Sequence, residues 1–127
     1  MIAPKVVLQP ATMQDARWFW QVRNQASVRL NSQQQSVIRW ETHQQWFHQA
    51  LMDPNRVMLI VTDQELKVNV GILRYDINDK VAEVSIALSE QFCGRGYGGA
   101  ILFHGECWLK RQHAQIQHLR ATILEHN

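Results

Sequence analysis

Apolar residues recur at helical spacing in the first half of the chain. Val6–Leu8 is a short apolar run followed by Pro10, a pattern typical of an edge strand. The apolar positions that follow predict a helix over residues 12–25. Thr12 lies three residues before Asp15, which is the spacing of a capping box at the start of that helix.

A second amphipathic helix is predicted around residue 46. Thr42 repeats the capping pattern, and Asp53-Pro54-Asn55 is expected to end the helix. The polar stretch Ser32–Ser36 is interpreted as a loop between the two helices. The apolar face consists of Trp46, Phe47, Ala50 and Leu51.

The pattern changes to strands after residue 56. Val57–Val61, Val68–Tyr75 and Val81–Leu88 are separated by short polar turns, which predicts an antiparallel meander. A helix over 98–113 and a last strand over 119–124 follow, so the last strand is expected to lie parallel to the third strand of the meander. The order βααβββαβ predicts one α/β domain over residues 1–127, a mixed central sheet flanked by helices on both faces.

Composition narrows the function classes. The chain has 127 residues, is 46% hydrophobic and 19% charged, and carries a net charge of +2. Scattered charge of this size argues against a nucleic-acid partner, and the lack of an apolar run of about 18 residues argues against a membrane span. The start does not resemble a secretory signal, so a cytoplasmic location is expected. Two cysteines without CxxC spacing and scattered histidines predict neither a disulfide scaffold nor a metal site.

The stretch most informative about chemistry is the loop after the third strand of the meander. Four glycines precede or open the predicted helix, and its free amides and dipole favour an anion such as a diphosphate, with Arg95 adding positive charge. The loop lacks the Gly-Lys-Ser/Thr of a Walker motif, and it does not follow a first parallel strand as a dinucleotide-binding fingerprint would. A glycine-rich turn without a ligand remains the alternative. The glycines are Gly94, Gly96, Gly98 and Gly99.

These residues resemble the GNAT superfamily of acyl-CoA-dependent N-acetyltransferases. The element order, the strand Ala82–Leu88 and the loop Cys93–Gly98 match that family, whose signature loop reads Gln/Arg-x-x-Gly-x-Gly/Ala. The resemblance implies acetyl-CoA as co-substrate and no metal. It implies that the strand backbone at Ile86, Ala87 and Leu88 binds the pantetheine arm and acetyl group. The residues it assigns to the diphosphate are Gly94, Arg95, Gly96, Tyr97, Gly98 and Gly99, and Cys93 is a further candidate for binding the cofactor.

Two departures from the family affect these expectations. Cys93 occupies the position of the usual Gln or Arg, and the chain stops at Asn127, where the family continues with a helix and two strands. A GNAT-like fold without this C-terminal arm is therefore expected, and no tyrosine is assigned as general acid. The last strand would then expose an apolar edge, which favours a homodimer. A non-catalytic acyl-CoA-binding module is the alternative to an enzyme.

The first half of the chain bears on the acceptor. Trp20–Asn24 and Glu41–Phe47 resemble GNAT members that act on nucleotide-linked amino sugars, which implies acetyl transfer to a primary amine of a small molecule. Acetyltransferases of ribosomal proteins and of other small amines share parts of this pattern. Arg23 and His43 are candidates for the acceptor pocket; an ion pair and a packed, capping residue are the respective alternatives.

The third strand supplies the candidate catalytic groups. Glu83 is the candidate base, directly or through water, with a salt-bridged or solvated residue as its alternative. A backbone amide near Ala87 is expected to polarise the thioester carbonyl. Strand alternation puts Glu83, Ser85 and Ala87 on one face.

Overall fold

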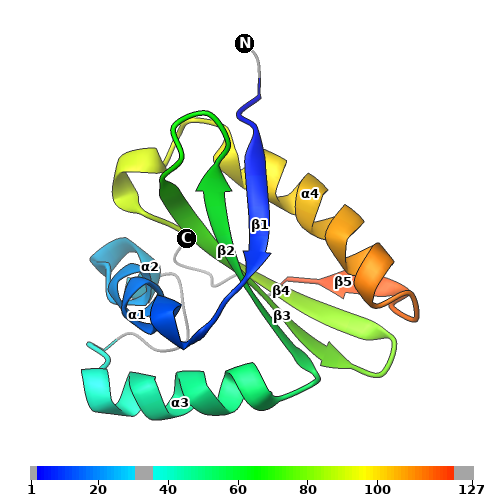
Figure 1. The fold of residues 1–127 in the computed structure, drawn as a ribbon, viewed down its shortest axis with the longest axis horizontal. Helices are drawn as coiled ribbons and strands as arrows, with labels where there is room; N and C mark the ends of the chain where they lie inside the picture. Colours follow the sequence, from blue (N-terminus) through cyan, green and yellow to red (C-terminus); the bar gives the residue numbers. More distant parts are fainter. Residues whose placement is uncertain (1–2, 31–35, 122–127) are drawn as a thin grey trace.

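A mixed five-stranded sheet forms the centre of the molecule (Figure 1). The computed structural model describes residues 3–30 and 36–121. Strands β1 to β4 are antiparallel neighbours, and β5 lies parallel to β4, as the sequence predicts. The strand order equals the chain order: β1 (Val6–Pro10), β2 (Arg56–Asp63), β3 (Asn69–Asn78), β4 (Val81–Leu88) and β5 (His118–Arg120).

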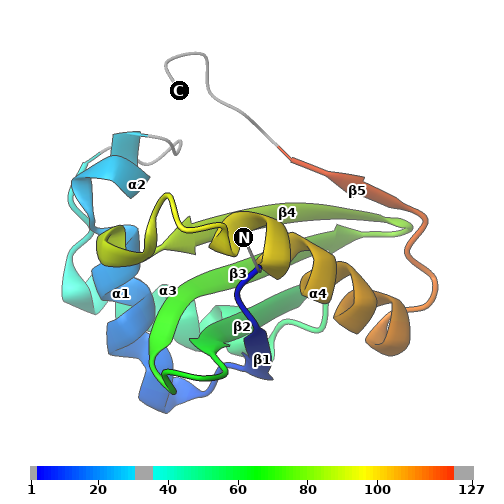
Figure 2. The ribbon, with the colours of Figure 1, turned by 90° about the horizontal axis from the view of Figure 1, so that it is seen from above.

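Helices cover both faces of this sheet, which confirms the predicted fold class. The helix α4 lies across one face, and α1 and α3 lie against the other (Figures 1 and 2). The helical elements are η1 (Met13–Asp15), α1 (Ala16–Arg23), α2 (Ala26–Leu30), α3 (Trp40–Met52), η2 (Glu90–Phe92) and α4 (Tyr97–Gln112).

Two hydrophobic cores follow from side-chain alternation along the strands. Leu59 and Leu73 point to the α4 face, where they pack with Ile101 of that helix. Ile60 and Ile72 point to the opposite face, where they pack with Phe47 of α3. On β4, Val84, Ile86 and Leu88 join the α4 core and Ala87 joins the other, so the predicted division of this strand's side chains is confirmed.

The helix boundaries differ from prediction at two places. The capping box is present, because the Thr12 amide donates to Asp15 Oδ2 at 2.9 Å, but the first turn is 3-10 and α1 ends at Arg23, before the separate helix α2. Thr42 is not the cap of α3. That helix begins at Trp40 with Arg39 as its cap, and the His43 amide already donates to the Arg39 carbonyl at 2.9 Å, so the prediction started the helix three residues late.

Two predicted segments lie wholly or partly outside the described residues. The loop Ser32–Ser36 is described only at Ser36, and the last strand is described as His118–Arg120, with its predicted remainder from residue 122 not covered. Within residues 3–30 and 36–121, no helix is both long enough and apolar enough to cross a bilayer.

Candidate active site

The glycine loop connects β4 to α4 and is held at both ends by buried aromatic rings. Phe92 ends η2 and Tyr97 begins α4, and their rings meet edge to face with centroids 5.6 Å apart. Between them, Cys93 to Gly96 are exposed. Gly94 and Gly96 have φ of 74° and 84°, in the left-handed region that side chains other than glycine avoid. Two glycines are therefore needed to turn the chain into the helix.

Gly98 and Gly99 are not explained by the chain's own geometry. Both lie in the first turn of α4, and a Cβ added to either would meet no atom within 4 Å. Each costs the helix about 1 kcal/mol relative to alanine. A ligand that binds the backbone amides needs such open space, because a side chain at either position would block its approach.

The loop also has donors for an anion. The amides of the first helical turn have no intrahelical acceptor, and Gly96 caps α4 without a side-chain hydrogen bond. In the described part of the chain, no amide from Gly94 to Gly99 donates to a backbone carbonyl outside the helix. The Arg95 guanidinium carbon lies 5.9 Å from the Phe92 ring centroid, at the same loop. These residues therefore fit a diphosphate.

The Tyr97 side chain points away from this open side. It is 5% exposed, and its hydroxyl donates a hydrogen bond to Asp63 at the end of β2. That bond raises the pKa of Tyr97, and the backbone amide of Leu66, followed by Tyr97 itself, lowers the pKa of Asp63. Only the backbone of Tyr97 is available to a ligand at the loop.

The edge of β4 that precedes the loop is the second part of the site. The Ser89 amide donates to the Val70 carbonyl at 2.9 Å, so by alternation the backbone groups of Ala87 also face β3. Those of Ile86 and Leu88 face the opposite edge. Among the described residues, β5 pairs with this edge only from Val81 to Glu83.

This alternation narrows one prediction. The amide expected near Ala87 is that of Ile86 or Leu88 at the open edge, because the Ala87 amide itself is turned into the sheet. The Leu88 carbonyl is already bound, since it accepts from Gln25 Nε2 at 2.8 Å. Ile86 is therefore the one residue of Ile86–Leu88 whose amide and carbonyl both lie on this edge and accept or donate no side-chain hydrogen bond in the described residues.

Gln25 is a residue of the site that the sequence analysis missed. Besides its bond to Leu88, its Oε1 accepts from the Glu90 amide at 2.9 Å. One side chain from the α1–α2 junction thus joins the end of β4 to the first residue of η2. No local pattern marks this glutamine, since its partners lie 63 and 65 residues away.

Glu83 lies where the described β4–β5 pairing ends. Arg120 is its register partner on β5, and Arg120 Nη2 is 3.3 Å from Glu83 Oε2. Three residues of strand, about 10 Å, separate Glu83 from Ile86. The structure therefore places the predicted base in an ion pair on the α1/α3 face, one of the two alternatives that the sequence left open.

His43 does not line an open pocket, in contrast to the prediction. Its side chain is 1% exposed, and both ring nitrogens have partners: Nε2 lies 2.8 Å from the Ala16 carbonyl and Nδ1 lies 3.0 Å from Arg23 Nη1. The carbonyl can only accept and the guanidinium can only donate, which assigns the neutral Nε2–H tautomer. Burial lowers the pKa of His43 to about 4. His43 therefore positions Arg23.

The tryptophan and asparagine near Arg23 hold the chain ahead of α3. Trp20 Nε1 donates to the Ile38 carbonyl at 2.8 Å, and Asn24 Nδ2 donates to the same carbonyl at 2.9 Å. The Ile38 amide donates back to Asn24 Oδ1 at 2.8 Å. This network fixes the start of α3 and with it His43.

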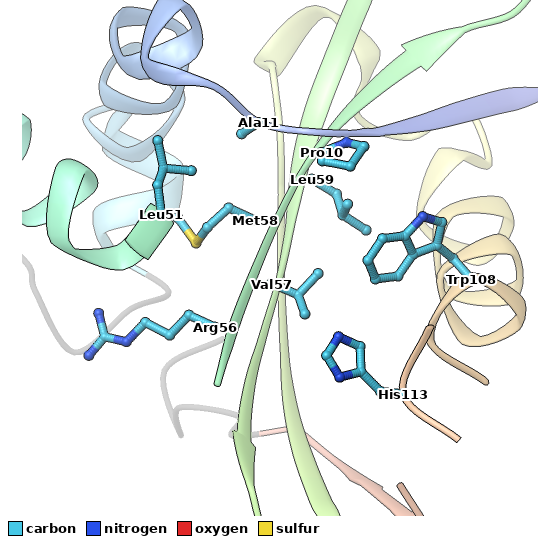
Figure 3. A pocket seen from close by; sticks show the side chains of 9 residues that line it. All are labelled: Pro10, Ala11, Leu51, Arg56, Val57, Met58, Leu59, Trp108 and His113. Atoms are coloured by element: carbon cyan, nitrogen blue, oxygen red, sulfur yellow. The ribbon is translucent and has the colours of Figure 1, made fainter. Parts of the chain in front are cut away.

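A small pocket lies at the β1–β2 side of the sheet, and β3 separates those strands from β4 (Figure 3). It is bounded by Pro10 where β1 ends, by β2 residues such as Val57, and by Trp108 and His113 of the α4 end (Figure 3). It contains none of the predicted site residues. Among the described residues, no group of three or more His, Cys, Asp or Glu side chains is arranged to hold a metal ion.

Comparison with known proteins identifies the fold. No protein-family model matches the chain, and no curated protein matches its sequence. Solved structures do match. The ribosomal L7/L12 α-N-protein acetyltransferase RimL, in complex with coenzyme A, superposes with a TM-score of 0.81 at 18% identity, over 100% of this chain and 75% of that one. The chain has the GNAT acetyltransferase fold.

Two further structures share this fold. A domain from Methanocaldococcus jannaschii gives a TM-score of 0.82 at 22% identity, over 98% of this chain and 80% of that one. The spermidine N-acetyltransferase of Vibrio cholerae, in complex with CoA and spermine, gives 0.74 at 14% identity. That match covers 85% of this chain, which spans 65% of the length of the Vibrio enzyme.

Proposed function

We propose that the protein transfers an acetyl group from acetyl-CoA to a primary amine of a small molecule. The observation that carries this proposal is the exposed loop Cys93–Gly96 with the first turn of α4, where Gly98 and Gly99 leave the amides open to a ligand. The GNAT fold supports it, since structures of this fold are N-acetyltransferases crystallised with CoA. A non-catalytic acyl-CoA-binding module is not favoured by these comparisons.

In this proposal the two parts of the site hold the two ends of acetyl-CoA. The amides from Gly94 to Gly99 and the Arg95 guanidinium bind the diphosphate. The open edge of β4 at Ile86 binds the pantetheine arm by strand-like hydrogen bonds. The Leu88 amide, on the same edge, is the candidate donor to the thioester oxygen, in place of the Ala87 amide.

The reaction needs a neutral amine and a polarised thioester carbonyl. The amine nitrogen forms a bond to the carbonyl carbon, the carbon–sulfur bond breaks, and the amine loses one proton while the departing sulfur gains one. Glu83 is the proposed base, and a chain of water molecules must relay the proton, because Glu83 lies about 10 Å along the strand from Ile86. The proton donor to sulfur is not assigned.

The finer proposal for the acceptor is an amino sugar linked to a nucleotide. It is supported by the resemblance of Trp20–Asn24 and Glu41–Phe47 to GNAT members of that specificity. In the first segment, Trp20 and Asn24 donate hydrogen bonds to the Ile38 carbonyl and so have a structural role. Arg23 is the residue of that segment that we propose contacts the acceptor.

Partner and oligomer proposals follow from the last strand. All three residues of β5 are exposed, and in the described residues β4 is its one strand neighbour. A second copy that pairs with this edge would give a homodimer. Light scattering after size-exclusion chromatography tests this, and a monomer at every concentration would count against it.

The proposed function is tested by adding bulk where the chain itself leaves space. Gly99→Val should abolish CoA binding measured by calorimetry and thiol release with an amine panel, because the branched side chain would occupy the diphosphate position. Gln112→Val places the same side chain at an exposed position near the other end of α4 and serves as the control. Unchanged CoA binding in Gly99→Val would overturn the proposal.

A further inference from the structure

Two arginines gather on the α1/α3 face beside β4. The guanidinium carbon of Arg23 lies 4.1 Å from the Trp46 ring centroid, and that of Arg74 lies 5.5 Å from the same centroid. Arg23 ends α1, Trp46 belongs to α3 and Arg74 to β3, so three elements build one cluster. The like charges are close enough that Arg74, after burial, helps to lower the pKa of Arg23 to about 10.

The cluster has more guanidinium groups than carboxylates. Arg74 Nε lies 3.3 Å from Asp76, but that carboxylate also lies 4.0 Å from Arg56, which has Asp53 at 3.5 Å. Including Arg23, this makes three cations for two anions. The next carboxylate on this face, Glu83, is in an ion pair with Arg120 at 3.3 Å.

Arg23 is held by a neutral partner. Its Nη1 donates to His43 Nδ1 at 3.0 Å, and no carboxylate of the described residues lies within ion-pair distance of it. A half-buried cation beside a second cation is costly unless an anion joins it. The Arg74 Nε is also buried, and its 3.3 Å contact with Asp76 is an ion pair without hydrogen-bond geometry.

The cluster lies next to the proposed site of acetyl transfer. Arg74 is the register partner of Ser85 on β4, and the Ser85 side chain is exposed on the same face. Ser85 directly precedes Ile86, whose backbone lies on the open edge of β4. Ala87, two residues further on the same face, packs against the same core cluster as Trp46 does. A molecule with its amine at this edge would reach the arginines with its other end.

We propose that Arg23 and Arg74 form an anion subsite, which selects an acceptor that carries a carboxylate or a phosphate in addition to its amine. This inference rests on the proposed acetyl transfer and names the acceptor class for it. Guanidinium groups bind both anions through paired hydrogen bonds, and Trp46 holds the two groups in place by cation–π contact. A polyamine, the kind of molecule bound in the Vibrio cholerae structure, would be repelled by the same cluster.

Matched acceptors test the charge requirement. The panel pairs 4-aminobutanoate with 4-aminobutanamide and glucosamine 6-phosphate with glucosamine, and 1,4-diaminobutane supplies a second positive charge. The two pairs distinguish a carboxylate from a phosphate. We expect kcat/KM for the anionic member of at least one pair to exceed that of its neutral partner by tenfold or more. We expect the diamine to be the poorest substrate.

Variants assign the preference to the cluster. Arg74→Gln should reduce the anion preference to about twofold or less, and Arg74→Lys should retain part of it. The CoA dissociation constant should not change in either variant, which shows that the fold is intact. Arg111→Gln removes an exposed arginine at the end of α4 and should leave the preference unchanged.

The outcomes separate this inference from the proposed function. Acetyl transfer with equal kcat/KM for charged and neutral acceptors, or with preference for the diamine, would overturn the anion subsite and leave acetyl transfer standing. If no amine is acetylated, the proposed function fails, and calorimetry with glucosamine 6-phosphate decides on the subsite alone. Binding that weakens tenfold in Arg74→Gln would support the subsite, and absence of binding would overturn it.

Discussion

The Tyr97 hydroxyl, on the first residue of α4, donates a hydrogen bond to the Asp63 carboxylate at the end of β2. The other carboxylate oxygen of Asp63 accepts from the amides of Glu65 and Leu66 at 2.9 and 2.8 Å. One side chain therefore fixes the β2–β3 turn and the start of the helix whose amides are proposed to bind CoA. The position of the glycine loop therefore depends on the buried contact between Tyr97 and Asp63.

Tyr97→Phe should lower the melting temperature and weaken CoA binding by up to about tenfold. The phenylalanine keeps the packing against Phe92 but leaves one Asp63 oxygen without its donor, so the start of α4 is held less firmly. Thermal unfolding and calorimetry measure the two effects. The proposed positioning role would be contradicted if stability fell while CoA affinity stayed the same.

The buried His43 predicts a pH dependence of stability. Its pKa is lowered to about 4 in the folded state, against an unfolded value of about 6.5. Between these values the unfolded chain binds a proton that the folded protein does not, so stability is present above pH about 6.5 and is lost as the pH falls toward 4. The loss is at most about 3 kcal/mol.

His43→Gln tests the source of this dependence. Its free energy of unfolding, measured by urea denaturation from pH 7 to pH 4, should fall less than that of the wild type. His48→Gln replaces an exposed histidine on the same helix and should keep the wild-type slope. Equal slopes in all three proteins would show that His43 is not the titrating group.

The parts of this protein that the sequence predicts are those with a local pattern. The meander, α4 and the glycine loop each depend on neighbouring residues, because strand alternation, helical spacing and positive φ are local properties. The pairs Tyr97–Asp63 and Gln25–Glu90 are 34 and 65 residues apart, and no spacing rule marks them.

His43 shows why the side of a helix is harder to predict than the helix. The sequence places His43 on the second helix, and the structure confirms this, but helical spacing cannot distinguish a core position from a pocket wall. His43 became a core residue because the Ala16 carbonyl and Arg23 satisfy its two nitrogens.

Gly105 of α4 should tolerate no side chain. A Cβ at this position would lie 2.5 Å from the Tyr75 hydroxyl oxygen and 2.7 Å from Leu73 Cδ2, both fully buried. Gly105→Ala should therefore destabilise the fold by roughly 1–3 kcal/mol, despite the higher helix propensity of alanine. Gly98→Ala, with open space around it, is the matched control for folding and should not destabilise.

Tyr75→Phe should offset part of the cost of Gly105→Ala. The Tyr75 hydroxyl is buried without a hydrogen-bond partner in the described residues, so its removal alone should be neutral or stabilising. In the double variant the phenylalanine also removes the oxygen nearest to the added methyl group. Urea denaturation of the four proteins gives the coupling free energy. A strictly additive double variant would contradict the close contact.

Gln25→Ala should separate the end of β4 from the loop that follows it. The substitution removes hydrogen bonds to the Leu88 carbonyl and the Glu90 amide, at a cost of roughly 1–2 kcal/mol of stability. Gln25→Glu is the sharper test: its carboxylate can still accept from the Glu90 amide but can no longer donate to the Leu88 carbonyl. If the β4 end is held through Leu88, both variants should raise KM for acetyl-CoA. If only the Glu90 contact matters, Gln25→Glu should bind acetyl-CoA like the wild type, and the bridge to β4 would have no part in the site.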